Sequence, residues 1–153
     1  MSTPADIPVN FFGSESYSLD DKGRVTVPFD WRRRDEVADV FYLVPDSKGE
    51  CLRAMREERY AKFGEEARNH LDMNPEKHRM FMRNFYSQCA KTTTDKQGRI
   101  TIPKAYCVRF RLKGEVRLNG AGDLFEIWNG TAQTAQQKRD APDFKKITGD
   151  LGL

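Results

Sequence analysis

The sequence of 153 residues has only three cysteines, two histidines and no long hydrophobic run. Cys51, Cys89 and Cys107 are odd in number and widely separated, which excludes a disulfide framework or a zinc knuckle, so we interpret them as small core side chains. The longest apolar run, residues 40–44, is too short to cross a bilayer. The first residues do not resemble a signal peptide. We therefore expect a cytoplasmic protein with no membrane partner.

The motifs of common enzyme classes are also lacking. The sequence contains no GxGxxG, no P-loop and no HExxH. His70 and His78 belong to no pattern of metal ligands or catalytic triads. The acidic residues between positions 57 and 66 alternate with basic ones, which is typical of a solvated helix face. We therefore expect no catalytic residues, no metal, no cofactor and no small-molecule substrate, that is, a protein that is not an enzyme.

Positive charge is concentrated in one part of the chain. The net charge is only +3, but residues 91–117 contain eight basic and two acidic residues, a local charge of +6. Such a concentration produces a basic face suited to nucleic acid, although a solvated basic surface is an equally good interpretation of charge alone.

One segment of the chain occurs twice. Residues 20–28 read DDKGRVTVP and residues 95–103 read DKQGRITIP, an offset of 75 residues with five identical positions. Two copies are too few for a solenoid, so the repeat indicates a duplicated unit whose halves share one core.

The shared letters of the repeat have a local structural meaning. Asp20 and Asp95 are placed to begin type I turns, with glycine three residues later. The next residues alternate, so that valine or isoleucine points to one face of a short strand while arginine and threonine point to the other. A proline then ends the strand and suits the first turn of a helix. Each copy therefore predicts strand, tight turn, short strand and short helix, with the first strands at residues 12–18 and 88–93.

Further elements follow in both halves. Residues 40–44 with 51–55, and 116–120 with 124–128, predict second hairpins, followed by helices at 57–69 and 131–139. Asn74-Pro75 begins another helix, to about residue 86, whose methionine and phenylalanine side we expect to pack between the repeats. Residues 141–153 have little apolar periodicity and are expected to fray or to pack loosely. The fold class is α+β and β-rich.

The duplicated arginines are the best candidates for a binding site. Arg24 and Arg99 each follow a tight turn on the strand face opposite the buried side chains. A guanidinium on a two-stranded ribbon is suited to bidentate contact with guanine in the major groove of DNA. The residues expected to contact phosphates nearby are Lys22, Thr26, Lys96 and Thr101. Alternatively, each arginine pairs with a nearby aspartate and only stabilises its turn.

The same residues resemble the signature of the MraZ family, part of the AbrB-like group of swapped-hairpin DNA-binding proteins. The resemblance lies in Phe12-Gly13, in Leu19 to Arg24 with Pro28, and more weakly in Asp95 to Arg99 with Pro103. The stretches Met73-Asn74-Pro75 and Phe125 to Trp128 also match. The family's basic motif carries over by position to Lys22, Arg24 and Arg99, whereas Gln97 stands where the first copy has Lys22.

The resemblance implies two tandem AbrB-like hairpin repeats in one pseudo-symmetric unit. It divides the chain into an N-terminal extension (1–10), a first repeat (11–70), a connecting helix (71–87), a second repeat (88–140) and a tail (141–153). It further implies a nucleoid-associated homo-oligomer, a closed ring, that binds G-rich direct repeats in double-stranded DNA. The expected outcome is repression of the cell division and cell wall gene cluster that includes its own gene. A ring-forming, antitoxin-like protein interaction module is the alternative.

Overall fold

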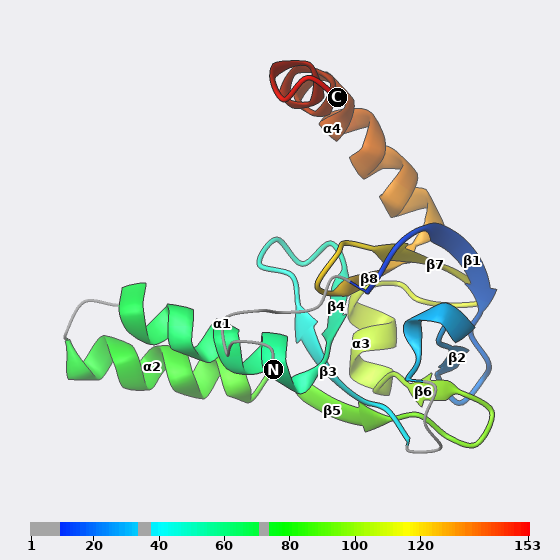
Figure 1. Cartoon of the computed structure of the whole chain (residues 1–153). Coiled ribbons are helices and arrows are strands. Elements are labelled where there is room, and N and C mark those ends of the chain that lie inside the picture. Colours follow the sequence, from blue (N-terminus) through cyan, green and yellow to red (C-terminus); the bar gives the residue numbers. More distant parts are fainter. Residues whose placement is uncertain (1–9, 34–37, 71–73) are drawn as a thin grey trace.

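The structure of the chain is a computed structural model that describes residues 10–33, 38–70 and 74–153. It is a β-rich α+β fold, which confirms the predicted class (Figure 1). In chain order the elements are β1 (Ser14–Ser18), β2 (Arg24–Thr26), the 3-10 helix η1 (Phe29–Trp31), β3 (Val40–Pro45), β4 (Leu52–Met55), α1 (Glu57–His70), α2 (Pro75–Tyr86), β5 (Ala90–Thr93), β6 (Arg99–Thr101), α3 (Lys104–Arg109), β7 (Glu115–Gly120), β8 (Phe125–Asn129) and α4 (Gly130–Asp150).

The strands form two antiparallel sheets that both contain strands of each copy of the repeat. The larger sheet has six strands in the order β1-β7-β8-β4-β3-β5, and the smaller has two, β2 and β6. When every strand is replaced by its counterpart in the other copy, the larger sheet has the same order read backwards. The two copies are therefore arranged with internal pseudo-symmetry.

The first strand of each copy pairs with the other copy. β1 pairs with β7 and β5 pairs with β3, while β2 pairs with β6. The expected two-stranded ribbon thus exists, and it takes one strand from each copy of the repeat. Within the first turn, Asp20 N–H donates to Arg24 O at 3.0 Å and Gly23 N–H donates to Asp20 O at 3.0 Å. Beyond the turn, the ladder partners of β2 come from β6.

The core lies beneath the small ribbon. Val25, Val27, Ile100 and Ile102 are all at most 1% exposed, as their alternation in the sequence predicts. They belong to one cluster with the aromatic side chains of Phe11, Trp31, Phe41 and Phe125. The rings of Trp31 and Phe125 lie 5.0 Å apart between centroids. Because the ribbon covers this cluster with its inner face, its outer face is left for polar side chains.

The helix pair α1 and α2 lies at one end of the larger sheet (Figure 1). Asn74 caps α2 by accepting hydrogen bonds from the N–H groups of Glu76 and Lys77, and Pro75 follows, as the sequence predicts. The apolar side of α2 faces α1, where the Phe85 and Tyr60 rings are 6.2 Å apart, and none of the residues of α2 is buried. The expectation that this side packs between the repeats is therefore wrong.

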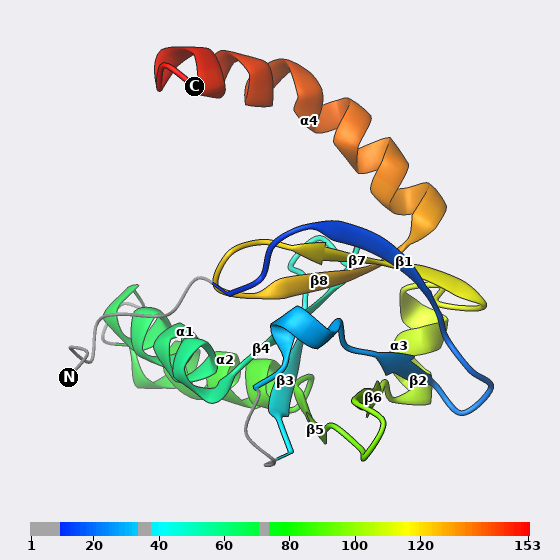
Figure 2. The ribbon, with the colours of Figure 1, turned by 45° about the vertical axis from the view of Figure 1, so that its right-hand side comes forward.

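The helix α4 leaves the body of the molecule and bends along its length (Figure 2). It runs through the predicted tail to Asp150 and contains Pro142, which removes one backbone hydrogen bond and favours a kink. Phe144 and Ile147 on its distal half, and Leu151 directly after its end, are exposed. The segment is exposed at nearly every position, as expected for loose packing, but it is helical to Asp150, so the expectation that it frays is wrong.

The predictions for cysteine are confirmed in part. All three cysteines are free; Cys51 is buried, whereas Cys89 and Cys107 are half-buried. Burial raises the pKa of the Cys107 thiol, which keeps it protonated at neutral pH. None of the helices that the structure describes is long and apolar enough to cross a membrane.

Candidate nucleic-acid interface

The ribbon of β2 and β6 brings four of the six predicted site residues onto one surface. In its register Arg24 lies opposite Thr101, and Thr26 lies opposite Arg99. The central pair, Val25 and Ile100, points into the core. Since neighbouring residues of a strand point to opposite faces, the two arginines and two threonines share the outer face. Residues 73 to 77 positions apart in the chain thus become direct neighbours.

The first turn, residues Asp20 to Arg24, is closed by its aspartate. Gly23 N–H donates to Asp20 O at 3.0 Å, which closes a β-turn where the sequence predicts one. Asp20 Oδ1 accepts from the N–H groups of Lys22 and Arg24, at 3.0 and 2.8 Å. Its Oδ2 accepts from Arg24 Nε at 2.6 Å. These donors, the Arg24 N–H first, hold the pKa of Asp20 below its ordinary value, so the carboxylate is charged at neutral pH.

The second turn, residues Asp95 to Arg99, repeats every one of these bonds. Gly98 N–H donates to Asp95 O at 2.9 Å. Asp95 Oδ1 accepts from the N–H groups of Gln97 and Arg99, each at 2.9 Å, and Oδ2 accepts from Arg99 Nε at 2.9 Å. The Arg99 N–H, followed by its side chain, likewise lowers the pKa of Asp95. The aspartate, glycine and arginine that are identical in the two copies therefore form the same hydrogen-bonded turn in each.

Each arginine pairs with the aspartate of its own turn, as the turn-stabilising interpretation expects. The aspartate engages Nε, which is the inner nitrogen of the guanidinium. Within the described part of the chain, the terminal nitrogens of Arg24 donate no hydrogen bond, and Arg99 Nη1 only approaches Asp20 Oδ2 at 3.9 Å. Arg24 and Arg99 side chains are 33% and 27% exposed. A guanidinium held at Nε keeps its two terminal nitrogens for a bidentate acceptor, so stabilising the turn and binding a ligand are compatible.

The remaining predicted residues flank this surface. Lys22 and Lys96 lie exposed in the two turns, Thr101 is exposed, and Thr26 is half-buried. A basic groove of about 700 Å³ borders the first turn and is lined by Lys22, Lys104, Arg111 and Lys113 among others. The basic stretch of the second repeat thus supplies much of the charge beside the turn of the first.

The glycine of each turn accepts a backbone hydrogen bond from the other copy of the repeat. Gly23 O accepts from Ile102 N–H at 2.7 Å, and Gly98 O accepts from Val27 N–H at 2.9 Å. Both glycines have a left-handed backbone, with φ of 79° and 77°. These bonds fix the two turns relative to each other, so the arginines are presented by a rigid base.

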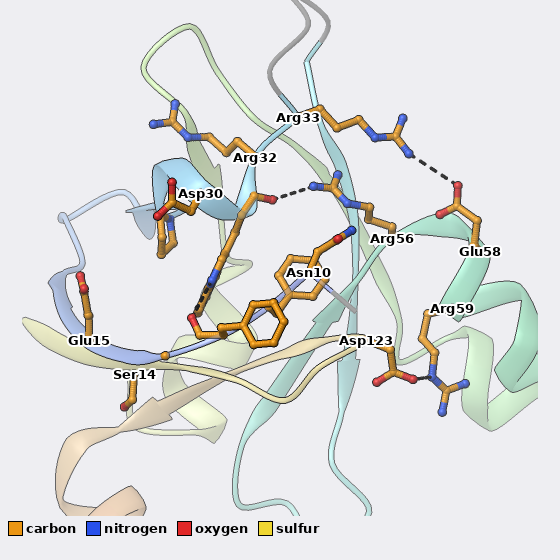
Figure 3. Close-up of a pocket in the computed structure, with 15 residues that line it drawn as sticks. Asn10, Ser14, Glu15, Asp30, Arg32, Arg33, Arg56, Glu58, Arg59 and Asp123 are labelled. Carbon is orange, nitrogen blue, oxygen red and sulfur yellow. Dashed lines mark hydrogen bonds and ion pairs between the residues drawn. The ribbon is translucent and has the colours of Figure 1, made fainter. Parts of the chain in front are cut away.

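An arginine-rich cavity was not foreseen from the sequence. It has a volume of about 710 Å³ and lies between residues 10–15, the end of η1 and the start of α1 (Figure 3). Its cations are paired: Arg33 with Glu58 at 3.5 Å, Arg59 with Asp123 at 2.8 Å, and Arg56 with the buried Asp39 at 2.6 Å. Arg32 differs, since its side chain points away from these three (Figure 3). The sequence feature that could have indicated this cavity is the run Arg32-Arg33-Arg34, of which Arg34 lies outside the described residues.

The arrangement offers charge and hydrogen-bond donors rather than reaction chemistry. Within residues 10–33, 38–70 and 74–153, no group of three or more histidine, cysteine, aspartate or glutamate residues could hold a metal ion. What the outer face of the ribbon can do is donate hydrogen bonds from two oriented guanidiniums to a planar or anionic acceptor.

Comparison with known proteins identifies the family of this chain. A family model described as "MraZ protein, putative antitoxin-like" matches residues 85–150. A transcriptional regulator MraZ of Syntrophobacter fumaroxidans is 38% identical over 140 residues, which cover 90% of this chain and 91% of the relative. The chain belongs to the MraZ family. Transcriptional regulators MraZ of Thermus thermophilus and Bacteroides thetaiotaomicron are 39% and 30% identical, over 77% and 88% of this chain and 81% and 86% of their own lengths.

The MraZ similarity includes both arginine turns. A match that covers 90% of the chain must contain residues 20–24 and 95–99, whichever end is left out. The family model alone covers only the second turn. The relatives are named as transcriptional regulators and not as enzymes, in agreement with the expectation from the sequence.

Proposed function

We propose that this MraZ-family chain is a sequence-specific regulator of transcription that binds double-stranded DNA through the outer face of the β2–β6 ribbon. The observation that carries the proposal is the pair of arginines on that face, each held at Nε by an aspartate. A guanidinium fixed in this way is suited to the O6 and N7 acceptors of guanine in the major groove. Lys22, Lys96, Thr26 and Thr101 contact flanking phosphates, which sets the register but not the sequence preference.

The biological setting proposed here follows the family resemblance. The protein acts in the cytoplasm, associated with the nucleoid, as a repressor of the cell division and cell wall cluster that includes its own gene. Its binding sites are short G-rich direct repeats. It needs no cofactor and no small-molecule substrate, and it catalyses no reaction.

The proposed working form is a homo-oligomer, as a closed ring. The distal half of α4 supports self-association, because Phe144, Ile147 and Leu151 recur at helical spacing and are 56–67% exposed away from the body (Figure 2). A second copy of this chain is the occupant that we propose for this face. A ring joins many weak ribbon contacts through effective concentration, so a monomeric form should lose most of its affinity for DNA. Light scattering on the whole chain tests this, and the mass of one chain at micromolar concentration would contradict it.

The experiment that tests DNA binding is fluorescence anisotropy with two labelled duplexes. One carries the sequence upstream of the protein's own gene and the other is its shuffled version, each at low and near-physiological salt. Preference for the native duplex that persists at the higher salt supports the proposal. Equal and salt-sensitive binding to both would indicate a non-specific nucleoid protein.

A second candidate function is an antitoxin-like protein interaction module, which the description of the matching family model favours. In that case the turns bind a protein rather than DNA, and neither duplex binds at either salt concentration.

A further inference from the structure

The two arginine turns differ in the charge that the turn itself carries. Lys22 precedes Gly23 in the first turn, whereas the neutral Gln97 precedes Gly98 in the second. If both turns approach the DNA backbone in the same way, the second turn lacks one cation. The structure shows a different cation at this place.

Arg32 lies directly against Gly98. A Cβ atom built on Gly98 would come within 2.5 Å of the guanidinium carbon of Arg32, so the guanidinium packs directly on this glycine. Arg32 belongs to the first repeat and comes directly after η1, and its guanidinium carbon lies 5.2 Å from the centre of the Phe29 ring. Arg32 thus crosses from one repeat to the turn of the other.

The equivalent contact at the first turn is neutral. Adding the repeat offset of 75 residues to Arg32 gives Cys107, and the Cys107 Sγ lies 3.7 Å from a Cβ built on Gly23. Each turn is therefore covered by one residue of the other repeat. The first turn contains a lysine, and the residue packed on its glycine is neutral. The second turn contains a neutral residue in the lysine's place, and the residue packed on its glycine is positively charged.

The surroundings of Arg32 leave its charge available. Its neighbours Arg33 and Arg56 are neutralised by Glu58 and Asp39, whereas Arg32 makes no ion pair within the residues that the structure describes. Its Nε is buried without a hydrogen-bond partner, and the residue as a whole is only half-buried. The guanidinium is held by packing on Phe29 and Gly98 instead of by a carboxylate, as is favourable for a group that is to meet an external anion.

We propose that Arg32 binds phosphate beside the second turn. It supplies from the first repeat the positive charge that is missing there because Gln97 stands where the first turn has Lys22. The inference rests on the proposed DNA binding and extends it to a residue outside both copies of the repeated motif. Because phosphate contact carries no sequence information, Arg32 contributes affinity and salt dependence equally on specific and shuffled duplexes.

The test compares Arg32→Gln with the double variant Arg32→Gln/Gln97→Lys. Arg32→Gln should reduce the slope of log K against log salt by about one per subunit, and lower affinity for both duplexes about three- to ten-fold near physiological salt. Gln97→Lys returns a cation to the same turn and should restore the slope. Arg33→Gln is the matched control, since Arg33 is already engaged by Glu58, and should leave the slope unchanged.

The outcomes separate this inference from the proposed function. If the wild type binds neither duplex, the proposed function itself fails. If the wild type binds and Arg32→Gln keeps the slope, or if Gln97→Lys does not restore it, Arg32 has only a packing role and the inference is overturned. Should Arg32→Gln melt far earlier than wild type, Arg32→Lys decides: a preserved slope supports the phosphate contact, and a lost slope in a folded Arg32→Lys protein contradicts it.

Discussion

The two arginine turns of this chain have the same hydrogen bonds and different surroundings. In both, one aspartate binds two backbone N–H groups and the Nε of an arginine. The first turn contains Lys22, has Cys107 packed on its glycine and borders a basic groove. The second turn contains Gln97 and has Arg32 packed on its glycine. The comparison teaches that both turns share one set of bonds made by aspartate, glycine and arginine, whereas the charge around each turn is supplied from different places in the chain.

The turns also differ in how the glycine is packed. A Cβ on Gly23 would come within 2.6 Å of the backbone oxygen of Ile102, which is fixed in the ribbon, whereas a Cβ on Gly98 meets the flexible end of Arg32. Both substitutions are strained by the left-handed backbone, at about 1–3 kcal/mol. We expect Gly23→Ala to cost about 1–3 kcal/mol more than Gly98→Ala, since backbone must move. Urea unfolding measures the difference, and equal losses would show that the two turns are packed alike.

The next largest effect is expected on DNA binding. Arg24→Ala and Arg99→Ala should each weaken specific binding by about 1–3 kcal/mol per subunit, because each removes a bidentate donor to guanine. Anisotropy with the native and shuffled duplexes measures the loss, which should be larger on the native one. Melting temperatures provide the control: a variant that melts much earlier than wild type, with binding to both duplexes reduced equally, would support a purely turn-stabilising arginine.

The smallest effect is expected from the aspartates, whose exposed ion pairs are weak. Asp20 is 2.6 Å from Arg24 Nε and 3.9 Å from Arg99 Nη1, whereas Asp95 forms an ion pair with Arg99 and with no second cation among the described residues. Both aspartates have a pKa below the ordinary 3.8, so their contribution to stability is complete above that pH and is lost as pH falls through the lowered value.

Acid unfolding followed by circular dichroism tests this order. Asp20→Asn should flatten the loss of stability below pH 4 more than Asp95→Asn does, because the charged form of Asp20 has two cationic partners. The same flattening in both variants would mean that the cross-turn contact to Arg99 contributes nothing.

Local features of the fold were largely predictable from the sequence. The turns at Asp20 and Asp95, the buried Val25 and Ile100, and the capped start of α2 each depend on residues within a few positions of one another. The apolar side of α2 could not be placed, because methionine and phenylalanine at helical spacing indicate that a helix face is covered but not by which element. Arg32 was missed for a similar reason, since its partner Gly98 is far away in the chain.

The sequence by itself determined the duplication, the turn in each copy and the family resemblance, because all three are written in short stretches of adjacent residues. Only the tertiary structure decided that β2 pairs with β6, that Arg24 and Arg99 share one outer face, and that Arg32 covers the turn of the other repeat. The physical reason is that backbone hydrogen bonds between strands are the same whichever strands they join. The choice of partner is made by how the whole core is buried, and no local pattern records it.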